Sequence, residues 1–129
     1  MPTLSNPTLK IELVSGTTQV KVTASVRAAF DSVEENFIKL LGLKFRLKCN
    51  ILGADSGLNG ADDALFSIAS KTILEDGSFT FTRTVNRSSL DEDWEGNDEI
   101  YAKFRLASTT ASLPLAATPV KSPAITGNF

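Results

Sequence analysis

Two acidic segments, residues 55–63 and 91–99, are the places where residue types and spacing could support ligand chemistry. In each segment, oxygen-bearing side chains recur at short intervals and a glycine stands at the sixth position, as at the start of an EF-hand calcium loop. The candidate calcium ligands are Asp55, Asn59, Asp62 and Asp63 in the first segment and Asp91, Asp93, Glu95 and Asp98 in the second. Calcium, if any cofactor, is therefore the one that this sequence suggests.

Neither segment completes the EF-hand pattern. The twelfth position, which supplies a bidentate glutamate in an EF-hand, holds Phe66 in the first segment and Ala102 in the second. The flanking residues also lack the pattern of paired helices. Two interpretations stay open. One is a looser calcium site between strands, and the other is a pair of ordinary solvated turns, in which Asp, Asn and Gly are favoured.

Trp94 lies among the carboxylates of the second segment and is a candidate partner-binding residue. An exposed tryptophan can anchor a protein or stack on a sugar ring, because it offers a large rigid apolar surface with one polar group. The alternative is that the indole folds back and caps the end of a β-sandwich. The sequence leaves both interpretations open.

Catalysis has little support in the residue inventory. The chain contains no histidine, which removes the commonest general base and excludes Ser-His-Asp and Cys-His catalysis within the chain. The single cysteine, Cys49, has the parity of an inward-facing strand residue, so we expect an inert buried thiol. A glycosidase-like carboxylate pair would need a cleft-forming insertion that is not visible. We expect a protein that is not an enzyme.

Lys44, Arg46 and Lys48 alternate along one predicted strand and therefore share one face of it. Together with Arg83 or Arg105 from other strands, they could form a patch for acidic partners. The alternative is an ordinary solvated sheet face with cross-strand ion pairs. The net charge of −2 and the pI of about 5.1 argue against nucleic acid as a partner.

The elements that would position these residues are β-strands. Alternation of apolar and polar residues predicts strands over residues 8–14, 19–30, 43–53, 64–74, 79–85 and 100–106. The tail, with Pro114, Pro119 and Pro123, predicts an edge strand or an irregular return path. We therefore predict one all-β domain over residues 1–129, an antiparallel β-sandwich of about seven strands. No apolar run is long enough to span a membrane.

Residues 31–41 form the one segment with helical spacing, through Val33, Phe37, Leu40 and Leu41. Asp31 or Ser32 could cap the start of a short helix. The alternative is a turn at residues 34–36 followed by extended chain.

The stretch from Asn97 to Lys103 resembles the approach to the penultimate strand of immunoglobulin-like domains. In that resemblance, Tyr101 is the tyrosine of a tyrosine corner and Lys103 stands where antibody domains place their second cysteine. The strand that carries Phe45 stands where those domains place the core tryptophan. The chain lacks the cysteine pair, and its only tryptophan lies in a loop. The resemblance implies an immunoglobulin-like or fibronectin-like sandwich, and it transfers no function.

These observations predict a non-catalytic binding or structural module that presents loops or a sheet face to a protein partner. The alternative is a calcium-dependent adhesion or carbohydrate-binding domain that uses segments 55–63 and 91–99. We expect neither nucleic-acid binding nor membrane insertion. Exposed edge strands leave association into a homo-oligomer open.

Overall fold

The computed structural model describes residues 2–53, 63–89, 98–109 and 114–127. Within these ranges the chain forms eight strands, one α-helix and a short 3-10 helix at Arg87–Ser89. In chain order the elements are β1 (Thr3–Leu13), β2 (Gln19–Ala29), α1 (Ser32–Leu41), β3 (Phe45–Gly53), β4 (Asp63–Ile73), β5 (Gly77–Asn86), β6 (Asp98–Ser108), β7 (Val120–Lys121) and β8 (Ile125–Gly127).

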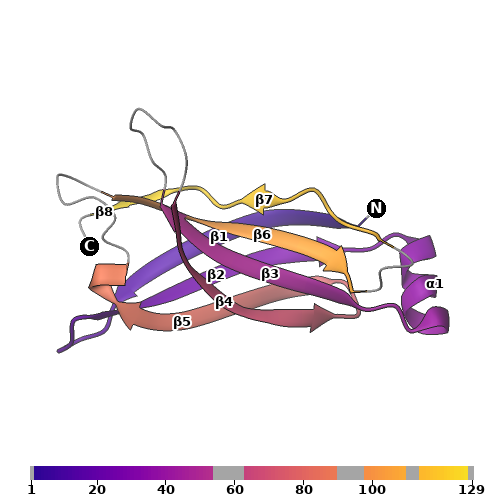
Figure 1. The fold of residues 1–129 in the computed structure, drawn as a ribbon, viewed down its shortest axis with the longest axis horizontal. Helices are drawn as coiled ribbons and strands as arrows, with labels where there is room; N and C mark the ends of the chain where they lie inside the picture. Colours follow the sequence, from indigo (N-terminus) through magenta and orange to yellow (C-terminus); the bar gives the residue numbers. More distant parts are fainter. Residues whose placement is uncertain (1, 54–62, 90–97, 110–113, 128–129) are drawn as a thin grey trace.

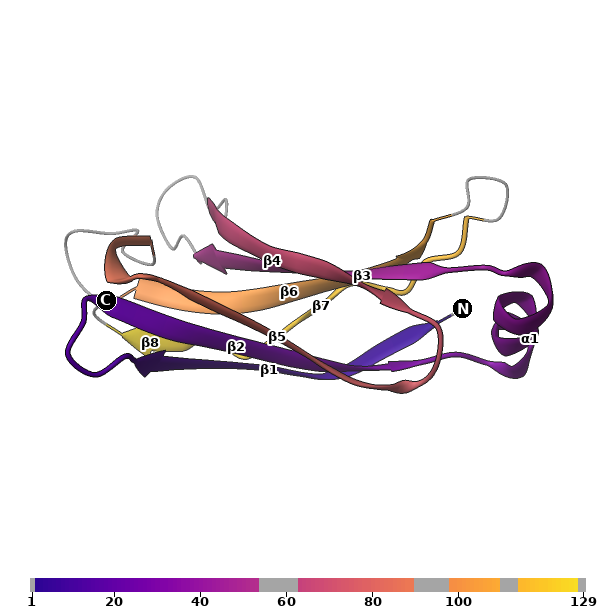
Figure 2. The same cartoon turned by 90° about the horizontal axis from the view of Figure 1, so that it is seen from below.

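The strands form two antiparallel sheets that pack face to face (Figures 1 and 2). The three-stranded sheet has the order β1-β2-β5, and the five-stranded sheet has the order β4-β3-β6-β7, with β8 also paired to β6. The predicted antiparallel β-sandwich with one short helix is confirmed. The tail contributes two very short strands, and Pro119 and Pro123 flank β7 because proline cannot donate a ladder hydrogen bond.

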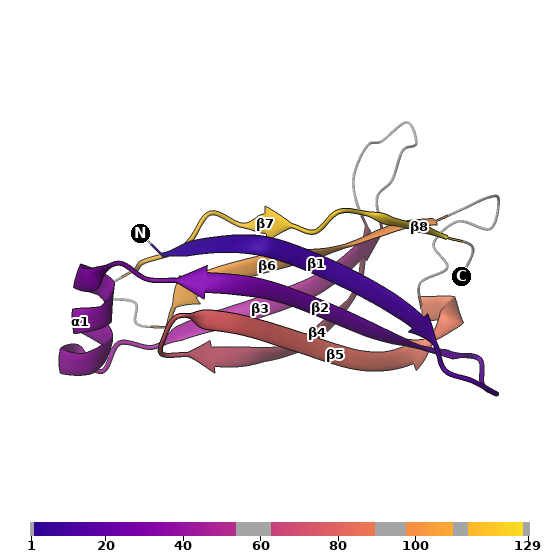
Figure 3. The same cartoon turned by 180° about the vertical axis from the view of Figure 1, so that it is seen from behind.

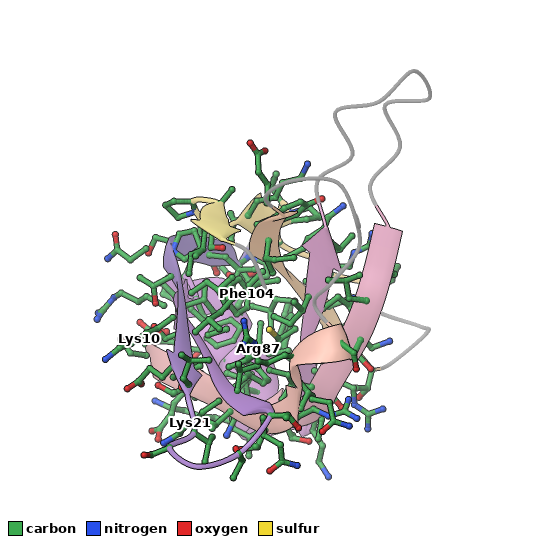
Figure 4. All side chains as sticks on the ribbon, turned by 90° about the vertical axis from the view of Figure 1, so that its left-hand side faces the viewer. Lys10, Lys21, Arg87 and Phe104 are labelled. Atoms are coloured by element: carbon green, nitrogen blue, oxygen red, sulfur yellow. The ribbon has the colours of Figure 1, made fainter. Side chains whose placement is uncertain are left out.

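The core lies between the inward faces of the two sheets and follows the period-two pattern of the sequence. Along β2, β3 and β6, every second residue is buried. Phe81 of β5 meets Phe104 of β6 across the sandwich with 6.1 Å between ring centroids, and Phe30 meets Phe45 at 4.8 Å. Figure 4 shows Phe104 between the layers. Burial of these rings is a main source of stability.

Helix α1 closes one end of the sandwich and connects the two sheets (Figures 1 and 2). Its start is a capping box. The Asp31 carboxylate accepts a hydrogen bond from the Glu34 N–H at 2.8 Å, and Glu34 Oε1 accepts one from the Asp31 N–H at 2.9 Å. The bond from Glu34 lowers the pKa of Asp31. Gly42 ends the helix with φ of 68°, and Phe37 and Ile38 pack against the core. The helical alternative for residues 31–41 is therefore correct.

The two long sides of the sandwich are closed differently. On one side β7 lies beside β1, as Figures 1 and 3 show. On the other side β4 and β5 are edge strands of opposite sheets, and long cationic side chains bridge them. The guanidinium of Arg83 lies 5.2 Å from the centre of the Phe66 ring and donates to the Ser67 carbonyl at 2.7 Å. Lys71 lies 5.5 Å from the centre of the Phe81 ring.

We predict that Phe104→Ala lowers the free energy of unfolding by about 3–5 kcal/mol, because it removes a fully buried ring that contacts Phe81. Arg105→Ala, one residue away on the exposed face, is the matched control and should change stability by less than about 0.5 kcal/mol. Urea unfolding followed by circular dichroism measures both values. Equal effects of the two substitutions would contradict this assignment of the core.

Candidate functional site

The outer face of the five-stranded sheet gathers cationic side chains from three adjacent strands. Their positions share the outward parity of the sheet, opposite to the buried core residues. We call this surface the basic face. It consists of Lys44 just before β3, Arg46 and Lys48 on β3, Lys103 and Arg105 on β6, and Lys121 on β7. The patch predicted from Lys44, Arg46 and Lys48 therefore includes Arg105, one of the two arginines that were expected to join it. It also includes Lys103 and Lys121.

The strand register places like charges directly opposite each other on this face. Lys48 of β3 pairs with Arg105 of β6, and Lys103 of β6 pairs with Lys121 of β7. Directly opposite side chains in an antiparallel pair have Cβ atoms about 4.5–5.5 Å apart, and like charges in such pairs are destabilising. Two such pairs on one face are an arrangement that stability alone would disfavour.

Within the described residues, none of these cations forms an ion pair. The outer face of the three-stranded sheet is different, because there Glu12 lies directly opposite Lys21 and also forms an ion pair with Lys10 at 3.5 Å. Figure 4 shows Lys10 and Lys21 on that outer face, away from the core. An ordinary solvated face with cross-strand ion pairs thus describes the three-stranded sheet. It does not describe the basic face.

A hollow of about 370 Å³ lies within the basic face. Its lining consists of Arg46, Lys48, Arg105, Ala107, Ser108 and Thr109. The floor is held in place by hydrogen bonds to the main chain. Thr109 donates to the Lys44 carbonyl from its N–H at 2.9 Å, and the Ser108 hydroxyl accepts from the Leu115 N–H at 3.1 Å. Two guanidinium groups beside an ammonium are suited to carboxylate, phosphate or sulfate oxygens, because guanidinium binds such groups through paired N–H donors.

Arg83 is not part of the basic face, because it belongs to the three-stranded sheet and reaches across to β4. Cys49 is fully buried in the core, and burial raises the pKa of its thiol to about 12. At neutral pH the thiol is therefore protonated and is not a nucleophile. The prediction of an inert buried cysteine is confirmed.

Tyr101 and Lys103 do not occupy the positions that the immunoglobulin resemblance gives them. Both have the outward parity of β6, whereas the second cysteine of an inter-sheet disulfide must face inward. Tyr101 is nevertheless only 5% exposed, and the Lys121 ammonium lies 5.2 Å from the centre of its ring. Phe45 does lie in the core, as the resemblance implied. The match at Lys103 was wrong because Lys103 faces outward. A shift of one residue along a strand is enough to move a side chain from one face of the sheet to the other.

The candidate calcium ligands and Trp94 fall outside what the structure describes. Asp55, Asn59, Asp62, Asp91, Asp93, Glu95 and Trp94 lie outside the described residues, and the described parts of Asp63 and Asp98 do not include their side chains. In the described part of the chain, no group of three or more His, Cys, Asp or Glu residues could hold a metal ion. The same part contains no helix that is long and apolar enough to cross a membrane.

The calcium hypothesis predicts a rise in melting temperature when excess Ca²⁺ replaces a chelator. A ligand that binds only the folded state stabilises it by about 2.7 kcal/mol at a hundred times its dissociation constant. If the second segment binds calcium, Asp93→Ala should abolish the rise in melting temperature. If the first segment binds it, Asp55→Ala should do so. Superimposable unfolding curves with and without calcium would leave both segments as solvated turns.

Conversion of the like-charge pair into an opposite-charge pair should stabilise the fold. We predict that Arg105→Glu raises the free energy of unfolding by about 0.5 kcal/mol at low ionic strength, because the new carboxylate lies opposite Lys48. The gain should shrink in high salt. Glu12→Lys on the other sheet makes the reverse change opposite Lys21 and should lower stability. Urea titrations at two salt concentrations measure both effects, and a loss of stability in Arg105→Glu would contradict the prediction.

Comparisons with known proteins give fold likenesses only. No family model and no curated protein matches this sequence. Similar solved structures include a protein from Archaeoglobus fulgidus, with 14% identity and a TM-score of 0.48 over 98% of this chain and 99% of that one. A solution structure described as of the late embryogenesis abundant (LEA) type has 10% identity and a TM-score of 0.41, over 98% of this chain and 70% of that one. A structural-genomics target has 10% identity and a TM-score of 0.37, over 95% of this chain and 85% of that one. We infer no function from these likenesses.

Proposed function

We propose that this chain is a non-catalytic binding module that holds an acidic protein segment on its basic face. The proposal rests on two like-charged cross-strand pairs in the strand register, Lys48 with Arg105 and Lys103 with Lys121. An acidic partner would neutralise the repulsion in both pairs, so the unfavourable arrangement in the free protein becomes favourable in the complex.

The hollow supports a specific contact rather than general attraction. Arg46 and Arg105 line it together with Lys48, so a carboxylate that enters could be met by more than one cation. Of the described carboxylates, none lines the hollow. An acidic side chain from a partner would therefore not compete with a described acid of this chain.

A protein partner fits this face better than a nucleic acid does. Proteins that bind single-stranded nucleic acid combine a basic groove with exposed aromatic rings on which bases stack. On the basic face the only described aromatic ring is that of Tyr101, and it is buried beneath Lys121.

We also propose that the sandwich is of the immunoglobulin-like or fibronectin-like kind. Its first, second and fifth strands form one sheet, and its third and sixth strands are neighbours in the other. In immunoglobulin constant domains the corresponding strands are divided in the same way, although the fourth strand there joins the first sheet. Here β4 pairs with β3 instead.

The experiment is a titration with a fluorescent peptide of alternating Glu and Gly, followed by anisotropy at low and physiological salt. We expect Arg105→Glu to weaken binding by about tenfold or more, because it removes a cation of the hollow and adds an anion. Arg27→Glu, an exposed position on the outer face of the three-stranded sheet, makes the same change in net charge and should leave binding unchanged.

Two results would overturn the proposal. Equal weakening by both charge reversals would show that only net charge matters and that the basic face is not a site. Tighter binding of a single-stranded oligonucleotide than of the peptide would assign the face to nucleic acid instead of protein.

A further inference from the structure

Strand β5 is a long edge strand with an unusually regular ladder. It pairs with β2 over ten consecutive positions, from Gly77 opposite Ala28 to Asn86 opposite Gln19, without a register shift. No other described strand pairs with its second side. A straight edge of this kind presents evenly spaced backbone N–H and C=O groups, which form a template for another strand.

The two other long edge strands, β1 and β4, carry features that oppose strand addition. In β1 the ladder is interrupted between Ser5 and Thr8, where Pro7 lacks an N–H and Asn6 has φ of 51°, and β7 lies beside the strand. The ladder between β4 and β3 has two register shifts, and Arg83 already occupies the Ser67 carbonyl of β4.

Strand β5 has none of these protections within its described residues. It contains no proline and no bulge, and Arg83 is its only charged side chain. Arg83 also points toward β4 rather than outward along the sheet edge. Among the long described edge strands, β5 is therefore the one that is suited to pairing.

We propose that two copies of this chain associate through β5, paired antiparallel with itself about a two-fold axis. Side chains that are directly opposite in an antiparallel pair point to the same face, so the pairing must keep inward and outward residues matched. With Thr82 on the axis, Thr82 of one copy lies opposite Thr82 of the other, and Thr80 lies opposite Thr84. All three threonines are exposed on the outer face, and threonine pairs are favourable across strands.

This register places no like charges directly opposite each other, because Arg83 is the only charged residue of β5. Arg83 of one copy lies opposite Phe81 of the other, so the two Arg83 side chains do not face each other. The same surface patch is used by both copies, as a closed two-fold interface requires. The result would be one continuous sheet made from the two three-stranded sheets.

The first test is analytical ultracentrifugation of the full chain from low to high micromolar concentration. We expect a reversible monomer–dimer equilibrium in the wild type. Thr82→Lys and Thr82→Glu should each weaken the dimer by about tenfold or more, because each places like charges opposite each other across the axis. An equimolar mixture of the two variants should restore association. Thr23→Lys, on the interior strand β2 and opposite Thr82 within one copy, is the control that should dimerise like the wild type.

The second test is cross-linking, which reports the register directly. Thr82→Cys should form an intermolecular disulfide on mild oxidation, because opposite residues lie within disulfide distance across an antiparallel pair. Cys49 is buried and does not compete. Thr23→Cys, on the interior strand β2, should form no intermolecular disulfide under the same treatment. A wild type that remains monomeric throughout, or Thr82 variants that associate like the wild type, would overturn the proposal. Neither result would affect the acidic-peptide titration, because the basic face lies on the other sheet.

Discussion

The contact between the inward faces of β2, β3 and β6 is the interaction on which the rest of this structure depends. Each of these strands buries every second side chain, and the phenylalanine rings of Phe81 and Phe104 meet between the two sheets. Because successive side chains of a strand point to opposite faces, burial of one set commits the other set to the outside. The basic face is thus a direct consequence of core packing, since Lys48 and Arg105 alternate with buried neighbours.

The outer faces of the two sheets differ in how their charged and polar side chains are paired. On the three-stranded sheet, Glu12 lies opposite Lys21 and threonines pair with threonines or serines across strands, as Thr23 does with Thr82. Such pairs stabilise the sheet locally. On the five-stranded sheet the register repeats one sign of charge, and the described acid with the same outward parity on β6, Glu99, lies opposite Thr126 and not opposite a cation. Proteins generally depart from locally favourable choices where a surface has a task beyond folding. That difference between two faces of one small domain is the reason to place a binding site on the second.

The alternating pattern in β2, β3 and β6 allowed their faces to be assigned from sequence, because period two is a local property. The capping residue Asp31 could also be predicted from sequence, although a turn remained an alternative to the helix. The structure favours the helix, since Glu34 completes the capping box. The opposition of Lys48 and Arg105 was not accessible, since register depends on pairing between distant strands. Lys121 was missed because it lies in a proline-rich tail without periodicity. In that tail, the Ser122 N–H donates a hydrogen bond to the Ala102 carbonyl of β6, and the Ser122 hydroxyl accepts one from the Ala102 N–H, each at 2.8 Å.

The course of the chain along the long axis has a mechanical consequence. Strand β1 starts beside the end of β2 that leads into α1, and β8 lies against the start of β6 at the opposite end of the sandwich (Figure 1). Tension applied between Thr3 and Gly127 would therefore run nearly parallel to the strands. Ladder hydrogen bonds in antiparallel sheets are perpendicular to the strands, so this force would load many of them together in shear instead of opening them one at a time. Under stretching, such a domain should act as a stiff element that fails abruptly.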